Sequence, residues 1–343
     1  MKKIINKPDE LVEDMLEGFL YANNRDFVRI PGQKAYRKRV IQDKVCVMAN
    51  GGAGCEPMHI GYVGNGMGDA TCIGEVFAAP SAFSIYETAK AIHTGKGVLL
   101  ICGNFAGDYL NSDMAVELLA LDGIEAELVL VRDDILSAPR HERQNRGGIA
   151  GILYVLKTAG AASEAGCALQ EVARLARKAA ENTCSIPVVL YSGYNPQNGQ
   201  KMFDMPEDCL EFGMGFNGEP GVERLPMTTA DGIADRLLFW LEQEMPMEKG
   251  MEICLLVNSM GATGYMELLI LCKELYERFQ RRNVKVYDIK VNRYLTSQEM
   301  GGCSVSILKL DEELKRYYDC EAHTPVFTHR GARGGRHEGK ALC

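Results

Sequence analysis

The sequence predicts an α/β protein of two domains, and three observations support this prediction. The chain has 343 residues, which is more than one hydrophobic core usually serves. Short apolar runs alternate along it with longer segments in which apolar residues recur every three or four positions, as expected for strands and helices in turn. The composition, with 46% hydrophobic and 24% charged residues, is that of a globular protein and excludes a disordered chain, collagen and a coiled coil.

The first half of the chain has the pattern of an amphipathic helix followed by alternating strands and helices. Apolar residues from Leu11 to Leu20 fall on one face of a helix, and Pro8 favours a helix start just before them. The later segments are expected as strand 45–49, helix 83–93, strand 97–102, helix 110–121, strand 126–132, a basic loop at 140–148 and small-residue-rich helical sequence at 149–183. This alternation implies a layered domain with a largely parallel sheet.

The second half of the chain also alternates strand and helix patterns, but its sequence does not repeat that of the first half. Its expected elements are strands 185–191, 252–258, 284–291 and 303–310 and helices 229–244 and 266–281. The polar stretch 192–221 is long for a plain loop and is a candidate for building a site. We therefore predict one domain over residues 1–184 and another over 185–327. Residues 328–343 are rich in Gly and Arg without an apolar period, so we expect a disordered tail with solvated histidines at His329 and His337.

Charge and cysteine usage narrow the class of protein. The formal net charge is -8, which argues against nucleic-acid binding because phosphate recognition needs clustered positive charge. No apolar run approaches the roughly 20 residues of a membrane helix, and the N-terminus lacks the apolar core of a signal peptide. We therefore expect a cytoplasmic protein. The 12 cysteines are isolated and form no CxxC pair, so we expect neither a metal site nor a disulfide framework.

Three glycine-containing segments follow predicted strands, at residues 50–54, 103–108 and 261–264. Ligands of parallel α/β sheets bind outside the carboxyl ends of the strands, so these segments together predict a site for a small polar ligand. The alternative is that each glycine only makes a turn. The sequence contains neither a Walker A loop nor a GxGxxG fingerprint, so we predict no nucleotide site in this chain.

Two titratable residues lie near these loops. Asp108 stands at a predicted strand-to-helix turn, where a carboxylate either caps the helix or acts as a general base. His59 follows the first glycine-rich loop but has apolar neighbours, which favours a hydrogen-bonded core histidine over a base.

With these segments in view, the chain resembles the substrate-binding subunit of dihydroxyacetone kinase, the DhaK family, from the N-terminus to about Phe327. The matching stretches occur in the family's order and lie at residues 51–59, 61–67, 97–101, 104–111, 215–221, 256–263, 296–297 and 322–325. The resemblance implies a two-domain α/β fold, a homodimer, and binding of a three-carbon ketose. It also implies a separate nucleotide-bearing subunit of the DhaL type, which carries ATP or ADP with magnesium, so this chain itself is expected to bind no cofactor.

Departures from the family pattern concern the expected site. Where the family has the histidine that holds the ketone as a hemiaminal, this chain has Asn217, and an amide nitrogen is too weak a nucleophile for that addition. Cys55 replaces a second histidine, and Gly103 replaces a lysine that contacts the ligand. Of the family's usual polar set, Asp108 and the backbone of Gly51 and Gly52 remain.

Two functions are consistent with this altered site. The first is a substrate-binding subunit that holds a small hydroxylated carbonyl compound or polyol without a covalent bond, through the backbone of Gly51 and Gly52, with Asp108 as the base. Asn217 and Cys55 are its other candidate contacts. The second is a noncatalytic metabolite sensor or coactivator of the same family. Cys55 is either a new nucleophile, if its pKa is lowered, or a space-filling replacement for the histidine.

Overall fold

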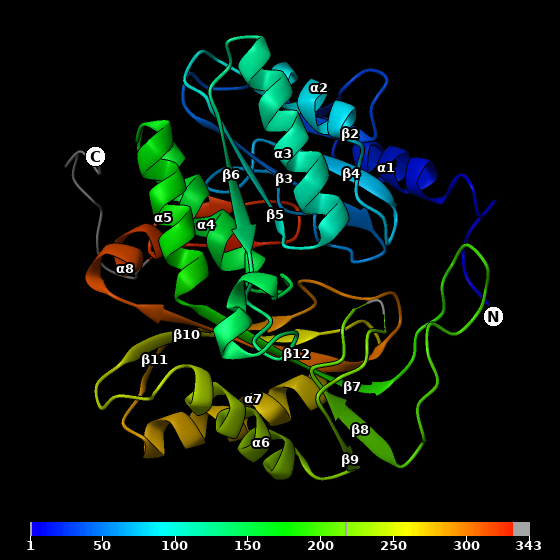
Figure 1. Cartoon of the computed structure of the whole chain (residues 1–343), viewed down its shortest axis with the longest axis vertical. Helices are drawn as coiled ribbons and strands as arrows, with labels where there is room; N and C mark the ends of the chain where they lie inside the picture. The colour runs from blue at the N-terminus through cyan, green and yellow to red at the C-terminus, as the bar shows by residue number, and fades with distance from the viewer. Residues whose placement is uncertain (1, 217, 332–343) are drawn as a thin grey trace.

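The first of two sheets is built around a strand that is buried on both faces. The structure is a computed structural model that describes residues 2–216 and 218–331. Figure 1 shows the first sheet in the upper half of the molecule. Strand β3 (Cys46–Ala53) pairs in parallel with strands on both sides, as a continuous apolar run predicts. The sheet order is β1-β2-β4-β3-β5-β6, with β1 (Phe27–Arg29), β2 (Ala35–Lys38), β4 (Ala70–Val76), β5 (Val98–Gly103) and β6 (Ala126–Val131). Apart from the antiparallel edge of β1 and β2, the predicted parallel sheet is confirmed.

Helices cover both faces of this sheet because alternate side chains of β3 point to opposite sides. Cys46 and Met48 belong to the core shared with α2 (Ala82–Ile92) and α3 (Ala106–Leu121). Val47 and Ala49 belong to the core shared with α4 (Ile152–Glu164) and α5 (Leu169–Glu181). The amphipathic helix predicted at the N-terminus is α1 (Leu11–Ala22), which buries Val12 and Leu16 beside β1 and β4.

The second sheet lies below the first in Figure 1 and has the order β11-β10-β12-β7-β8-β9. Its strands are β7 (Thr183–Tyr191), β8 (Cys209–Phe212), β9 (Glu223–Pro226), β10 (Glu252–Ser259), β11 (Lys285–Asn292) and β12 (Gly301–Leu310). Only β10 and β11 pair in parallel, so the parallel character predicted for the first half does not extend to this sheet. Its outer face is covered by α6 (Ala230–Glu244) and α7 (Tyr265–Arg281).

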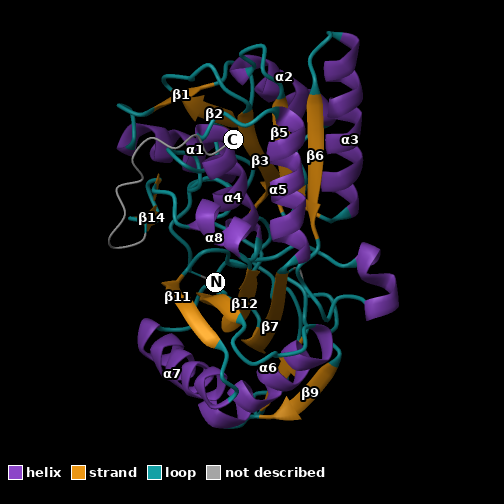
Figure 2. Cartoon of the chain, turned by 90° about the vertical axis from the view of Figure 1, so that its left-hand side faces the viewer, coloured by secondary structure: helices purple, strands orange, loops and turns teal. Residues whose placement is uncertain are grey.

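Helix α4 lies between the two sheets. Every residue from Ile152 to Ser163 is buried, as expected for a helix that packs on all sides. The core around it contains residues of β3 and β5 from the first sheet and Leu256 and Leu308 from the second. The two halves therefore share one hydrophobic core, and Figure 2 shows α4 and α8 (Glu312–Tyr318) above the strands of the second sheet.

The C-terminal segment returns to the first half of the chain. Nζ of the buried Lys157 in α4 donates to the carbonyl oxygen of Tyr317 at 2.9 Å, and the His323 N–H donates to the carbonyl of Asn65 at 2.8 Å. Strand β13 (Ala322–His323) pairs with β14 (Thr328–His329). The prediction of a disordered tail with a solvated His329 is thus wrong at the start of that tail, because His329 is buried against Tyr318. His337 and the rest of residues 332–343 lie outside the described residues.

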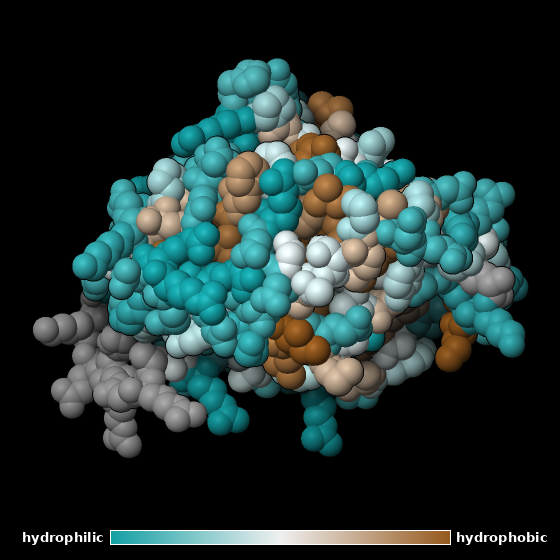
Figure 3. Space-filling view, turned by 90° about the horizontal axis from the view of Figure 1, so that it is seen from below, coloured by the Kyte–Doolittle hydropathy of each residue, from teal (hydrophilic) through white to brown (hydrophobic). Residues whose placement is uncertain are grey.

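The surface carries apolar side chains on the exposed side of α7, chiefly Met266, Leu269 and Ile270. Figure 3 views the molecule from the side of α6 and α7 and shows apolar side chains interrupting a mainly hydrophilic surface. Among residues 2–216 and 218–331, no helix is both long and apolar enough to cross a membrane.

Candidate functional site

A cavity of about 350 Å³ opens at the carboxyl ends of β3 and β5. It is lined by five of the six predicted site residues, namely Gly51, Gly52, Cys55, Gly103 and Asp108. The sixth, Asn217, lies outside the described residues, although its neighbour Phe216 lines the cavity. Phe216 and Leu295 come from the second half of the chain, so the site lies where the two halves meet.

The glycine-rich wall of the cavity leaves no room for side chains at two positions. A Cβ atom on Gly51 would lie 2.1 Å from Nε2 of His59, and one on Gly52 would lie 2.9 Å from the backbone nitrogen of Ala78. Both distances are shorter than van der Waals contact allows, so only glycine fits without displacement of these neighbours. The close packing brings backbone polar groups to the edge of the cavity, where a small ligand can reach them.

Asp108 supplies the carboxyl group of the cavity. It lies in the first turn of α3, whose N-cap residue is Phe105, so Asp108 does not occupy the capping position. Its Oδ1 atom is buried without a hydrogen-bond partner among the described residues. Burial raises the pKa of Asp108 from 3.8 to about 7. A carboxyl group with one unpartnered oxygen and a pKa near neutrality favours the general-base interpretation over capping.

Cys55 is held as a thiol. Burial, followed by the nearby carboxylates of Glu56 and Asp108, raises its pKa well above the ordinary value. Its Sγ atom lies 3.5 Å from the carbonyl oxygen of Gly52. The alternative of a nucleophile with a lowered pKa is therefore wrong, because desolvation and the carboxyl groups of Glu56 and Asp108 all oppose ionisation of the thiol. Cys55 fills space beside the glycine-rich wall.

His59 is a pocket residue that the sequence interpretation missed. It lines the same cavity, is 7% exposed, and its Nδ1 atom has no hydrogen-bond partner among the described residues. The prediction of a hydrogen-bonded core histidine is therefore wrong about the hydrogen bond at Nδ1, although the residue is buried as predicted. Burial lowers its pKa to about 4, so the imidazole is neutral at physiological pH. Its position just after the glycine-rich loop was the available signal.

The third predicted loop, at residues 261–264, does not line this cavity. Strand β10, which precedes it, lies in the second sheet, so its carboxyl end is separate from those of β3 and β5. A Cβ atom on Gly261 would lie 2.0 Å from the carbonyl oxygen of Gln298, and its φ is +141°. Gly261 therefore serves a close backbone crossing, which is the turn-making role weighed for these loops.

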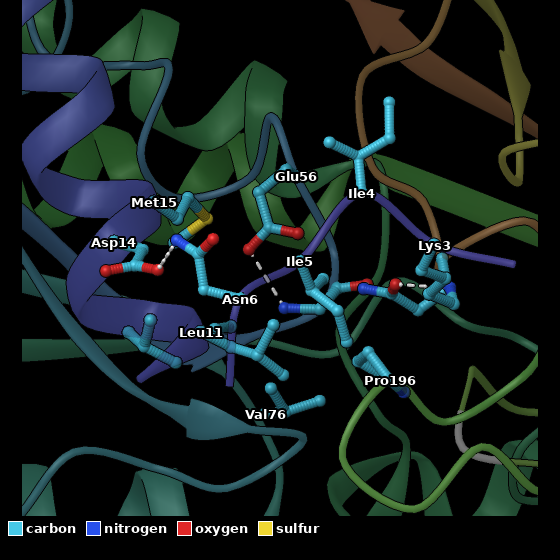
Figure 4. A pocket seen from close by; sticks show the side chains of 14 residues that line it. Lys3, Ile4, Ile5, Asn6, Leu11, Asp14, Met15, Glu56, Val76 and Pro196 are labelled. Atoms are coloured by element: carbon cyan, nitrogen blue, oxygen red, sulfur yellow. Dashed lines mark hydrogen bonds between the residues drawn. The ribbon is translucent and has the colours of Figure 1, made fainter. Parts of the chain in front are cut away.

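Behind the glycine-rich loop lies another cavity of about 700 Å³, shown in Figure 4. Glu56 lies at this cavity, and its Oε1 atom accepts a hydrogen bond of 2.9 Å from the N–H of Gly54. The N-terminal segment closes the other side, where Nζ of Lys3 donates to Oε1 of Gln298 at 2.9 Å. These contacts hold the backbone that carries Gly51 and Gly52, and they connect the N-terminus to the second half of the chain.

The described residues offer no cluster of three His, Cys, Asp or Glu side chains that could hold a metal ion. In the cavity the chemistry-bearing side chains among the described residues are Asp108, His59 and Cys55. Together they provide one base with a pKa near neutrality, one neutral imidazole and one thiol, within walls of backbone amides. Such a set can position a small polyhydroxylated molecule and accept a proton from it.

Comparison with known proteins places this geometry in context. The Dak1 domain family matches residues 17–326. The dihydroxyacetone-binding subunit DhaK of PTS-dependent dihydroxyacetone kinase 2 from Listeria innocua is 37% identical over 330 residues, which cover 95% of this chain and 99% of that one. D-erythrulose kinase from Mycolicibacterium smegmatis is 38% identical over 95% of this chain, which spans 56% of that kinase. The solved structure of the dihydroxyacetone kinase operon co-activator DhaQ superposes with a TM-score of 0.87 at 27% identity, covering 92% of this chain and 98% of that one.

Proposed function

The chain belongs to the Dak1 domain family, and from that membership we propose that it is the substrate-binding subunit of a dihydroxyacetone kinase-type phosphotransferase. It presents a small hydroxylated carbonyl compound or polyol to a separate nucleotide-bearing subunit. The observation that carries this proposal is the Asp108 carboxyl group in a glycine-walled cavity, with its Oδ1 atom buried and without a hydrogen-bond partner among the described residues. The relatives named for dihydroxyacetone and erythrulose indicate short ketoses as the first substrates to test.

In the proposed reaction Asp108 accepts the proton of the substrate hydroxyl group while the oxygen of that hydroxyl attacks the terminal phosphorus of ATP. The bond from that phosphorus to the bridging oxygen breaks, and ADP leaves on the partner subunit. Burial holds the pKa of Asp108 at about 7, so the carboxylate is available as a base above neutral pH. The nucleotide, ATP or ADP with magnesium, belongs to the partner subunit of the DhaL type. Positioning and electrostatic stabilisation supply most of the catalysis in phosphoryl transfer, so a noncovalent pocket suffices.

The substrate is held without a hemiaminal in this proposal. Asn217 stands where the family resemblance places the hemiaminal histidine, and Cys55 stands where it places the second histidine. His59, the imidazole that lines the cavity, has its Nε2 atom packed against Gly51, which favours a binding contact over a covalent one.

The test is phosphoryl transfer to a panel of trioses, tetroses and polyols, with the nucleotide-bearing subunit from the same cell, magnesium and ATP. We expect turnover that Asp108→Asn abolishes and that the matched exposed variant Asp113→Asn on the same helix retains. Turnover that survives Asp108→Asn refutes the role of Asp108. Absence of turnover on every substrate, with a partner subunit active beside a conventional DhaK protein, refutes the kinase function.

The second candidate function is a noncatalytic sensor or coactivator. Its specific support is the close superposition on the DhaQ co-activator, together with the replacements at Cys55 and Gly103. A sensor need not bind the nucleotide-bearing subunit, so complex formation with that subunit separates the two functions. A homodimer and a cytoplasmic location also belong to this proposal, and sedimentation of the purified chain tests the homodimer.

A further inference from the structure

A separate polar cavity of about 760 Å³ lies between the two halves of the chain. It is bounded by the end of β6, by the short helix η1 (Arg140–Asn145), by the start of β7, by the end of α6 and by Lys309 of β12. Figure 2 shows η1 projecting from the body of the molecule near the lower end of β6. This cavity has no lining residue in common with the Asp108 cavity.

Positive charge is concentrated in this cavity although the whole chain carries a net charge of -8. Its cationic lining residues are Arg132, Arg140, Arg143, Arg146 and Lys309. Two carboxylates, Glu181 and Glu244, face the same space. The five cations outnumber the two carboxylates, so the cavity is locally cationic in an acidic protein.

One of these cations, Arg146, forms an ion pair with Glu244 and has a structural role. Arg146 is 4% exposed, and its Nη2 atom lies 2.9 Å from Oε2 of Glu244. Its Nε atom donates to the carbonyl oxygen of Ala138 at 2.9 Å. Burial of Glu244 opposes its ionisation, but the hydrogen bond from Arg146 and the charges of Arg140 and Arg143 hold its pKa below the ordinary value. The Arg146–Glu244 pair therefore fixes one wall of the cavity.

Three other cations are unpaired. Arg132, Arg143 and Lys309 make no side-chain hydrogen bond and no ion pair with any residue in the described part of the chain. Elsewhere on the protein, arginine and lysine side chains commonly have carboxylate partners, as Arg174 and Arg236 do. Like charges that face one space repel each other, and an anion in that space removes the repulsion.

We propose that this cavity is a binding site for a phosphate-bearing small molecule that carries at least two negative charges. Guanidinium groups present paired N–H donors that match phosphate oxygens, and Lys309 adds a point charge. The volume exceeds that of a bare phosphate ion and falls in the range of sites for small metabolites. One residue connects the walls of the two cavities. Asn104, whose neighbours Gly103 and Phe105 line the Asp108 cavity, donates from Nδ2 to the carbonyl oxygens of Gln144 at 3.1 Å and Arg146 at 2.7 Å, and both of these residues line the cationic cavity.

Calorimetric titration of the full-length chain with inorganic pyrophosphate tests the proposal. We expect binding that weakens at least about tenfold in the double variant Arg132→Gln, Lys309→Gln, because two charge-assisted contacts are lost. The matched double variant Arg293→Gln, Lys249→Gln removes the same charges from exposed positions outside the cavity and is expected to bind as the wild type does. Asp108→Asn is also expected to bind normally, and added potassium chloride should weaken binding in every protein that binds.

Four results overturn the proposal. They are absence of pyrophosphate binding to the wild type, equal weakening in both double variants, loss of binding in Asp108→Asn, and unchanged binding in the Arg132→Gln, Lys309→Gln variant. If the Arg132→Gln, Lys309→Gln variant binds pyrophosphate normally but no longer associates with the nucleotide-bearing subunit, the cations bind that partner protein and the small-molecule site is refuted. Melting temperatures of the two double variants, measured alongside, verify that both are folded.

Discussion

Asp108→Asn probes the most unusual feature of the site, a carboxyl group whose Oδ1 atom is buried without a hydrogen-bond partner among the described residues. Burial moves its pKa from 3.8 to about 7 in the folded protein. Because each pKa unit is worth about 1.4 kcal/mol, ionised Asp108 lowers the free energy of unfolding by about 4 kcal/mol at most. Water in the open cavity screens part of this cost, so we expect about 2 kcal/mol.

The sign of the effect follows from proton binding. Between about pH 4 and pH 7 the folded chain holds a proton on Asp108 that the unfolded chain has released, so this group reduces stability as the pH rises. Above about pH 7 Asp108 is ionised in both states, so the free energy of unfolding falls no further from this group. Asparagine carries no charge, so the variant should be more stable than the wild type, and its advantage should be larger at pH 8 than at pH 5.

Chemical denaturation at pH 5 and pH 8, followed by circular dichroism, measures this difference. Asp113→Asn is the control, because Asp113 is exposed on the same helix. An advantage of Asp108→Asn that does not grow between pH 5 and pH 8 would contradict a raised pKa at this position. If Asp108 is also the base, turnover of the wild type should rise with pH through about 7 and then level off.

Three further perturbations test neighbouring parts of the structure. Gly51→Ala places a Cβ atom 2.1 Å from the imidazole beneath it, so the free energy of unfolding should fall by about 2 kcal/mol, and unchanged urea denaturation would refute the packing. Arg146→Ala leaves a buried carboxylate unpaired and should cost about 3 kcal/mol in the same assay, whereas Arg174→Ala, which breaks exposed pairs, should cost under about 1 kcal/mol. Equal losses in these two variants would contradict the burial. Iodoacetamide at pH 7.5 should modify Cys55 far more slowly in the native protein than in urea, because burial raises the pKa of this thiol. Peptide mass spectrometry measures the labelling, and fast labelling of the native protein would show that Cys55 is a thiolate.

The regular elements were the part of the fold that local sequence predicts well. Segments such as 83–93 and 110–121 have strong periodicity and appear as α2 and α3 within a few residues. The short strands β1, β2, β8 and β9, which form one end of each sheet, were missed, because three or four residues carry too little periodicity to be seen. The longer strand β4 was also missed. The antiparallel pairing of the second sheet was also missed, since strand direction depends on how the chain crosses over and not on local pattern.

For the site, the sequence by itself determined which residues bear chemistry. Asp108 and the loop that contains Gly51 and Gly52 were found from their places after predicted strands, which local sequence shows without any knowledge of the folded chain. Cys55 and Asn217 were found from the family resemblance, as replacements of two histidines. Residue types likewise determined that Asn217 cannot form a hemiaminal.

Only the tertiary structure decided which of these residues meet and how they ionise. It brought His59 into the Asp108 cavity and left the loop at 261–264 out, because β10 belongs to the other sheet. It raised the pKa values of Cys55 and Asp108, since desolvation depends on atoms contributed from distant parts of the chain. It also gathered Arg132 and Lys309, which are far apart in sequence, around one cavity. Local pattern cannot encode these effects, because burial and electrostatic proximity are properties of the folded chain.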